Sequence, residues 1–92
     1  MSVAIATRVF ASEVLVGLIR YYREKPGSQT EAAAALDLRT QVVSSNVRIL
    51  RHAGVLIEDE KPSGRRGARY VVDETRVRDL AATLVAYSLC ED

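Results

Sequence analysis

The chain has 92 residues, a length that fits one domain (residues 1–92), because a single hydrophobic core typically occupies about 50 to 200 residues. Hydrophobic residues make up 48% and charged residues 27%, so the composition indicates a folded globular protein and argues against an intrinsically disordered one. Cys90 is the single cysteine, which excludes a disulfide framework within the chain and a site of several thiolates, and which fits a reducing cytoplasm. Arg8, Ser12 and Glu13 interrupt the apolar N-terminal segment, so we expect no signal peptide, no membrane span and a cytoplasmic protein.

Positive charge is concentrated in the middle of the chain, although the net charge is only +1. Residues 1–38 carry four basic and four acidic side chains and are neutral. Residues 39–69 carry seven basic and three acidic side chains, a net charge of +4, whereas residues 70–92 have a net charge of −3. The middle third of the chain is therefore the part expected to contact the phosphate backbone of a nucleic acid.

The first predicted helix covers about residues 10–24, where apolar residues recur at spacings of three and four. Its expected buried stripe consists of Ala11, Leu15, Leu18, Ile19 and Tyr22. A second helix runs to Leu36, with Ser28 or Thr30 as its N-cap and four consecutive alanines that favour helix strongly.

A third helix is predicted from Thr40 to about Ala53, with Val43, Val47 and Leu50 on its buried face. Asp37 marks a tight turn before it, since aspartate tolerates left-handed backbone better than most residues. Gly54 supplies its C-terminal stop.

Two strands, at residues 55–60 and 68–72, form a predicted β-hairpin with a flexible, basic tip at residues 61–67. A last helix extends from about residue 74 to Leu89, capped by Asp73 or Thr75. The expected class is mainly α with a small hairpin, in the order helix, helix, helix, strand, strand, helix. Four tyrosines and one phenylalanine predict a core of packed helices without large aromatic side chains.

The segment LDLRTQVVSSNVRILRHAGV, residues 36–55, resembles the helix-turn-helix core of ArsR-like and MarR-like winged-helix regulators. In these families a leucine, a turn glycine and a second leucine precede a polar recognition helix. A leucine and then an alanine-glycine pair follow, and they lead into the β-hairpin called the wing. The resemblance covers about residues 10–72. Asp37 replaces the turn glycine, Asn46 stands where many ArsR-like proteins have histidine, and the paired thiolates of ArsR-like metal sensors are missing. The resemblance implies a winged helix-turn-helix fold and DNA binding, but no inducer.

In a helix-turn-helix the second helix enters the major groove, and its N-terminal and outward residues meet base edges. The candidates for base contacts on that helix are Thr40, Gln41, Ser44, Ser45 and Arg48, and Arg39, just before the helix, is a further candidate for DNA binding. Glutamine can bond bidentately to adenine and arginine to guanine, and no acidic residue on this helix would repel phosphate. Backbone contacts are expected from Arg51 and from the hairpin residues Lys61, Arg65, Arg66 and Arg69. The alternatives are a merely solvated helix face and a hairpin kept soluble by charge.

Other motifs argue against catalysis and cofactors. Residues 64–67 are glycine-rich and basic but lack the Gly-Lys-Ser/Thr ending of a phosphate-binding P-loop. His52 has no cysteine or second histidine for metal ligation and no obvious nucleophile partner, so a cap or phosphate contact is the favoured role. The acidic run 58–60 is interpreted as solvated, and Cys90 as a surface or interface thiol. We expect no metal, no cofactor and no enzymatic activity.

The last helix carries two apolar stripes where a monomer needs one. Val77, Leu80, Ala81 and Leu84 can face the helix's own domain, and the second stripe, about 120° away, predicts a homodimer interface made of Ala82, Val85, Ala86 and Leu89. The alternative is that residues 2–9 fold back over the second stripe.

These features together predict a sequence-specific regulator of transcription that binds double-stranded DNA as a homodimer. Repression of transcription is favoured over activation. The alternative is a winged-helix module that binds another protein and not DNA. The arginine cluster in the hairpin favours DNA.

Overall fold

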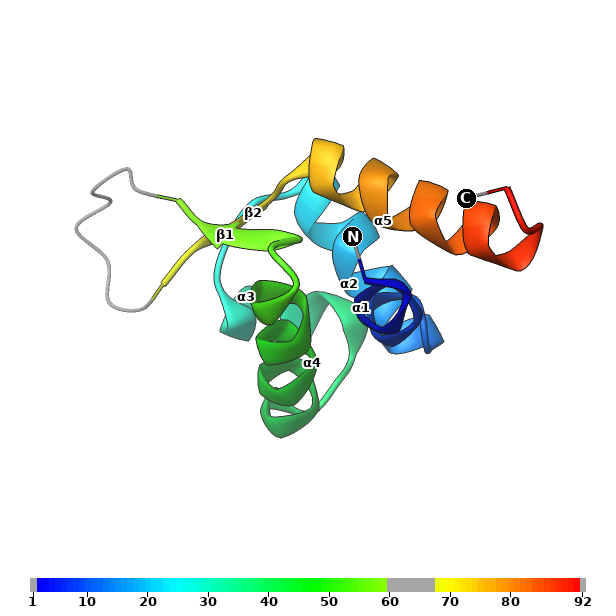
Figure 1. Cartoon of the computed structure of the whole chain (residues 1–92). Coiled ribbons are helices and arrows are strands. Elements are labelled where there is room, and N and C mark those ends of the chain that lie inside the picture. Colours follow the sequence, from blue (N-terminus) through cyan, green and yellow to red (C-terminus); the bar gives the residue numbers. More distant parts are fainter. Residues whose placement is uncertain (1, 60–67, 92) are drawn as a thin grey trace.

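A computed structural model describes residues 2–59 and 68–91 and shows a mainly helical chain with one small antiparallel hairpin (Figure 1). The elements in chain order are α1 (Val3–Val9), α2 (Glu13–Glu24), α3 (Gln29–Leu36), α4 (Thr40–His52), β1 (Leu56–Glu58), β2 (Tyr70–Val72) and α5 (Glu74–Ser88). In the view of Figure 1, the hairpin extends to one side, α4 projects downward and α5 lies across the top. The described elements include no helix long and apolar enough to cross a membrane.

Side-chain caps set where three of the helices begin. Ser28 and Glu31 form a capping box at the start of α3, and the Asp73 side chain accepts a hydrogen bond from the backbone N–H of Arg76 at the start of α5. Ser12 caps α2 in the same way, by accepting from Leu15 N–H. The predicted start of this helix at about residue 10 is therefore wrong, because the serine cap places residues 10–12 in the preceding turn.

Helix α1 was not among the predicted elements, so the observed order has one helix more than expected. Ala6 and Val9, three positions apart, are fully buried on one side of α1. Most tertiary contacts of α1 are with α5 and fewer are with α4. The N-terminal segment thus folds back onto α5, yet Val85 and Leu89 stay exposed.

The core lies where α2, α4 and the hairpin meet. Most predicted core positions are confirmed: the buried residues include Leu15, Leu18, Tyr22, Val43, Val47, Leu50 and Leu80. Ala11 is exposed because it precedes the first turn of α2, which corrects that part of the predicted stripe. Ile19, Val77 and Leu84 are partly buried against the cluster.

The expectation of a core without aromatic side chains is also wrong. Tyr22 is fully buried, and its ring makes an edge contact with Tyr70, which is 4% exposed. The Tyr22 hydroxyl donates a hydrogen bond to the carbonyl of Ser28 at 3.0 Å, so the ring can be buried without leaving a polar atom unpaired. Burial raises the pKa of Tyr22 above its ordinary range.

The hairpin strands are shorter than the predicted ranges 55–60 and 68–72. Leu56 pairs with Val72 and Glu58 with Tyr70. Val55 instead donates its N–H to the carbonyl of Leu50, and thus belongs to the chain's exit from α4. The predicted basic tip lies outside the described residues.

Shortening Leu50 tests how much the fold depends on the buried face of α4. We expect Leu50→Ala to lower the free energy of unfolding by about 2 to 5 kcal/mol, because the fully buried side chain would leave a cavity. Val16→Ala is the control, since Val16 is 47% exposed, and we expect it to change stability by less than about 0.5 kcal/mol. Urea unfolding followed by circular dichroism measures both, and equal losses would contradict this assignment of the core.

Candidate nucleic-acid interface

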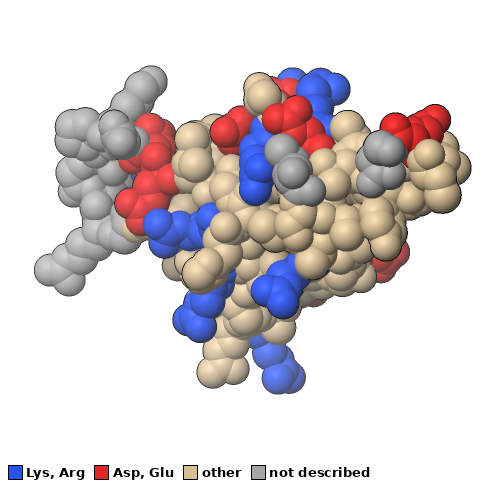
Figure 2. Space-filling view, in the orientation of Figure 1, with Lys and Arg blue, Asp and Glu red and all other residues tan. Residues whose placement is uncertain are grey.

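Helix α4 has one buried face and one polar exposed face. Val43, Val47 and Leu50 are at most 1% exposed. The exposed positions of α4 are Thr40, Gln41, Ser45, Arg48, Arg51 and His52, and Ser44 is half-buried. Since α4 contains no aspartate or glutamate, its exposed face is polar and positive. In Figure 2 the blue side chains over the lower part of the molecule, where Figure 1 places α4, have no red neighbour.

A tight turn fixes the N-terminal end of α4. Asp37 adopts the left-handed conformation, with φ 53° and ψ 49°, as its position in the sequence predicts. The N–H of Leu38 bonds to the carbonyl of Ala33 at 2.9 Å. Arg39 is the N-cap residue of α4, and its backbone carbonyl accepts hydrogen bonds from Val42 and Val43. The Arg39 side chain is therefore exposed at the N-terminal end of α4.

A side chain from α5 fixes the other end of α4. Arg76 Nε donates a hydrogen bond of 2.6 Å to the carbonyl of Ala53, the C-cap residue of α4. A guanidinium at a helix C-terminus also interacts favourably with the helix dipole. Gly54 follows with φ 78°, which confirms the predicted stop. The orientation of α4 is thus coupled to that of α5.

Two polar residues of α4 bond back to the helix itself. The Ser45 hydroxyl donates to the carbonyl of Val42 at 3.1 Å, and the Asn46 side-chain amide donates to the same oxygen at 2.8 Å. The Ser45 oxygen can still accept a hydrogen bond, but its proton is already engaged. Gln41 and Arg48 are consequently the long side chains of α4 that are most available to a ligand.

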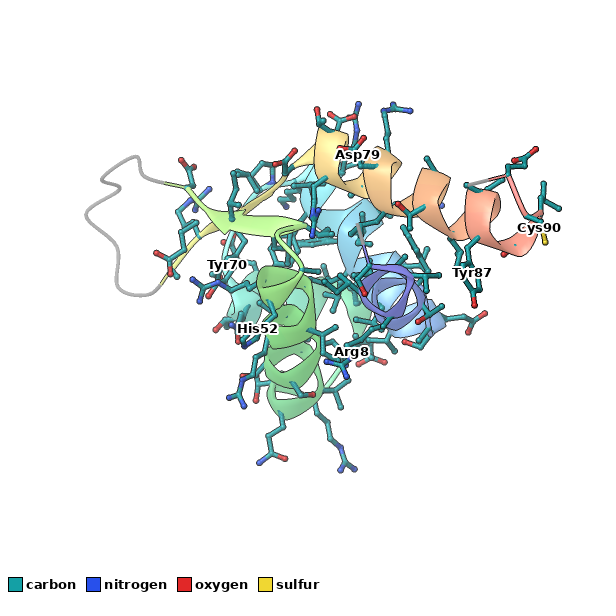
Figure 3. All side chains as sticks on the ribbon, in the orientation of Figure 1. Arg8, His52, Tyr70, Asp79, Tyr87 and Cys90 are labelled. Carbon is teal, nitrogen blue, oxygen red and sulfur yellow. The ribbon has the colours of Figure 1, made fainter. Side chains whose placement is uncertain are left out.

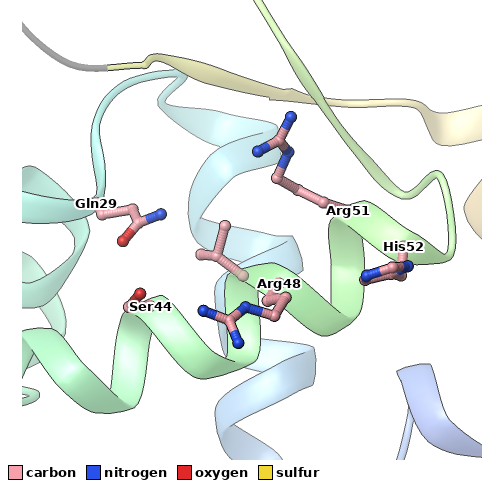
Figure 4. Close-up of a pocket in the computed structure, with 6 residues that line it drawn as sticks. Gln29, Ser44, Arg48, Arg51 and His52 are labelled. Carbon is pink, nitrogen blue, oxygen red and sulfur yellow. The ribbon is translucent and has the colours of Figure 1, made fainter.

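A polar hollow of about 410 Å³ lies between the start of α3 and the middle of α4 (Figure 4). It is lined by Gln29, Ser44, Val47, Arg48, Arg51 and His52. In Figure 4, Gln29 points from α3 toward α4, while Arg51 extends toward the strands. Gln29 was not among the predicted site residues. Gln29 lies in the first turn of α3, where the helix dipole attracts anions. This position in the sequence could have suggested that Gln29 belongs to the site.

The two predicted backbone-binding arginines in the described part of the chain already have acidic neighbours. Arg51 lies 3.3 Å from Glu58 and stacks over the ring of Tyr70 at 5.4 Å. Arg69 lies 3.8 Å from Glu31 and donates to the carbonyl of Pro26 at 3.3 Å. Both arginines therefore help to hold the hairpin against the helices, whatever else they bind.

Two other arginines of the predicted interface lack an acidic partner among the described residues. Among residues 2–59 and 68–91, Arg39 and Arg48 form no ion pair. Lys61, Arg65 and Arg66 lie outside the described residues, so their contribution stays a prediction.

His52 and Ser44 line the same hollow, but they cannot form a nucleophile–base pair. They are eight residues apart on one helix, which separates them by about 12 Å along the axis. In the part of the chain that the structure describes, no group of three or more histidine, cysteine, aspartate and glutamate side chains is placed to hold a metal. Gln29, Ser44, Arg48, Arg51 and His52 give the lining of the hollow positive charge and hydrogen-bond donors.

The predicted second stripe of α5 is largely exposed. Val85 is 52% and Leu89 63% exposed, Ala82 is exposed, and Ala86 is half-buried. Tyr87, which the sequence analysis did not include, is 61% exposed near the same end of the helix. Figure 3 shows Tyr87 and Cys90 at the C-terminal end of α5, far from the hairpin.

No protein-family model matches the chain, and no curated protein is significantly similar to it in sequence.

Proposed function

We propose that the protein is a winged helix-turn-helix regulator that binds double-stranded DNA in the cytoplasm and represses transcription. The observation that carries the proposal is the exposed face of α4, which is polar, positive and free of acidic residues, on a helix fixed at both ends. Helices α3 and α4, joined by three residues, would form the helix-turn-helix. The hairpin beside them would be the wing.

Base recognition is assigned to the outward side chains of α4. A helix fits the major groove, where glutamine can bond bidentately to adenine and arginine to guanine. Gln41 and Arg48 are exposed and have the reach for such contacts. Thr40 and Ser45 would add single hydrogen bonds, and Ser44 would line the edge of the contact.

The remaining cations would bind the phosphate backbone. Arg39 lies at the start of α4, and the polar hollow could hold a phosphate between Gln29 and Arg51. To bind it, Arg51 would exchange Glu58 for phosphate, which costs little because exposed ion pairs contribute only about 0 to 1 kcal/mol. Lys61, Arg65, Arg66 and Arg69 would contact the backbone or minor groove from the wing.

Two copies would join through the exposed stripe of α5. An exposed apolar stripe on a small domain is typical of an association surface. Its members would be Ala82, Val85, Ala86 and Leu89, with Tyr87 at the edge. A two-fold dimer would set two recognition helices about 34 Å apart and would read an inverted repeat.

A protein-binding module without DNA binding is the second candidate. The pairing of Arg51 and Arg69 with glutamates favours it, because these pairs reduce the positive charge available to phosphate. The two candidates differ in their response to salt and to base sequence.

The affinity for duplex DNA is expected to fall steeply with salt between about 50 and 200 mM, because each phosphate contact releases counterions. Arg39→Ala should reduce the slope of log affinity against log salt by about 0.9, and the Arg65→Ala/Arg66→Ala double variant by about twice that. Arg20→Ala, an exposed arginine on α2, is the matched control. Fluorescence anisotropy measures all four proteins. Absence of DNA binding at low salt would favour the protein-binding module.

Sequence preference is expected to depend on Gln41 and Arg48. Each good bidentate contact contributes about 1 to 3 kcal/mol of discrimination, so Gln41→Ala or Arg48→Ala should relax the preferred sequence at specific positions. Selection from a random duplex library, compared between wild type and variants, measures the preference. Full retention of the wild-type sequence by both variants would place base recognition elsewhere.

The protein is expected to be a dimer at micromolar concentration. Val85→Asp and Leu89→Asp should each produce monomers, because they would bury a charge in the interface. Val16→Asp is the control, since Val16 is similarly exposed but lies on α2. Equilibrium ultracentrifugation gives the masses. A wild-type monomer at this concentration would rule out the α5 interface.

A further inference from the structure

Two arginines of α4 share the lining of the polar hollow. Arg48 and Arg51 lie three residues apart on the helix, so their positive charges repel one another and a negative charge near them is stabilising. Among residues 2–59 and 68–91, Arg48 forms no ion pair, whereas Arg51 Nη2 lies 3.3 Å from Oε1 of Glu58. A carboxylate of the chain itself therefore engages one of the two cations.

This carboxylate belongs to the hairpin and not to the hollow. Glu58 is the last residue of β1 and does not line the hollow. Its cross-strand partner is Tyr70, and the Arg51 guanidinium lies over the Tyr70 ring, 5.4 Å from the ring centroid. The strand pair thus offers Arg51 a carboxylate and an aromatic face at one place. Figure 4 shows the Arg51 side chain directed toward the strands.

We propose that Glu58 sets the phosphate affinity of the hollow by competing with phosphate for Arg51. The inference rests on the proposed function, in which the hollow accepts a phosphate of the DNA backbone. A phosphate in the hollow would accept charge-assisted hydrogen bonds from Arg48 and Arg51 together. Because Arg51 must first leave Glu58, the attraction within that ion pair is subtracted from the affinity for phosphate. Glu58 is thus an autoinhibitory residue of the site.

The exchange of partners would also couple the hollow to the hairpin. Arg51 contacts both strands, through Glu58 on β1 and Tyr70 on β2. A phosphate that draws Arg51 into the hollow would remove its contact with Glu58, so the base of the hairpin would lose one of its contacts with α4. Phosphate binding would therefore change the surroundings of Glu58, although Glu58 itself does not line the hollow.

NMR of the full chain with inorganic phosphate at constant ionic strength tests the exchange without DNA. The Arg51 Nε–H and the backbone amide of Glu58 should shift with one shared dissociation constant, because one exchange affects both. Glu58→Gln should lower that constant about two- to fivefold, the size of one exposed ion pair. Glu74→Gln is the matched control and should bring no comparable gain. The Glu74 side chain is 51% exposed against 52% for Glu58, and it also pairs with arginines, but on α5 and α2.

A double-mutant cycle shows whether Glu58 acts through Arg51. In the Arg51→Gln background, Glu58→Gln should bring no gain, since no guanidinium remains to be released. Three results would overturn the proposal: no phosphate-dependent shift at Arg51, equal gains from Glu58→Gln and Glu74→Gln, or a gain that persists without Arg51.

The affinity of the same variants for duplex DNA separates this proposal from the proposed function. Phosphate exchange as expected in a protein that never binds duplex DNA would refute the proposed function and leave the role of Glu58 standing. Duplex binding without any effect of Glu58→Gln on phosphate affinity would refute the role of Glu58 and leave the proposed function standing. If both hold, Glu58→Gln should also raise the affinity for duplex DNA about two- to fivefold.

Discussion

The burial of one face of α4 determines which side chains this helix presents to solvent. Val43, Val47 and Leu50 must all lie inside, so the rotation of the helix about its axis is fixed and Gln41 and Arg48 must face outward. The left-handed turn before α4 and the Arg76 hydrogen bond at its end fix the direction of the axis. A helix held in this way can present its polar side chains without reorganisation, which reduces the entropic cost of binding.

The charges of the middle third serve the fold as well as a binding partner. Glu31 caps α3 and also neighbours Arg69, so the same carboxylate sets the start of a helix and anchors β2. Arg51 stacks on Tyr70, whose ring contacts the buried Tyr22. These contacts of Tyr70 hold the base of the hairpin against the core. A chain with a net charge of only +1 can keep a positive face on α4 because α4 itself carries no acidic residue, and on the face shown in Figure 2 many of the acidic side chains lie at the root of the hairpin and along α5.

Sequence reasoning was most successful where one residue type has one local physical role. The caps at Ser28 and Asp73, the left-handed Asp37 and the stop at Gly54 each depend on backbone geometry that few residues satisfy, and the structure confirms them. It failed where distant contacts decide. Helix α1 is short and depends on its packing against α5, and the burial of Tyr70, which was not predicted, depends on its edge contact with the distant Tyr22. The hollow that joins Gln29 to Arg51 also arises from tertiary packing, and it could not be read from spacing along the chain.

The proposed contact of duplex DNA with the exposed face of α4 can be tested in solution. Titration of the isotope-labelled protein with a short duplex at low salt, followed by NMR, tests it most directly. We expect the largest shifts at the side chains of Gln41 and Arg48 and at the backbone of Arg39, with the apolar end of α5 unchanged. Shifts confined to α5, or an α4 that does not respond to saturating duplex, would contradict it.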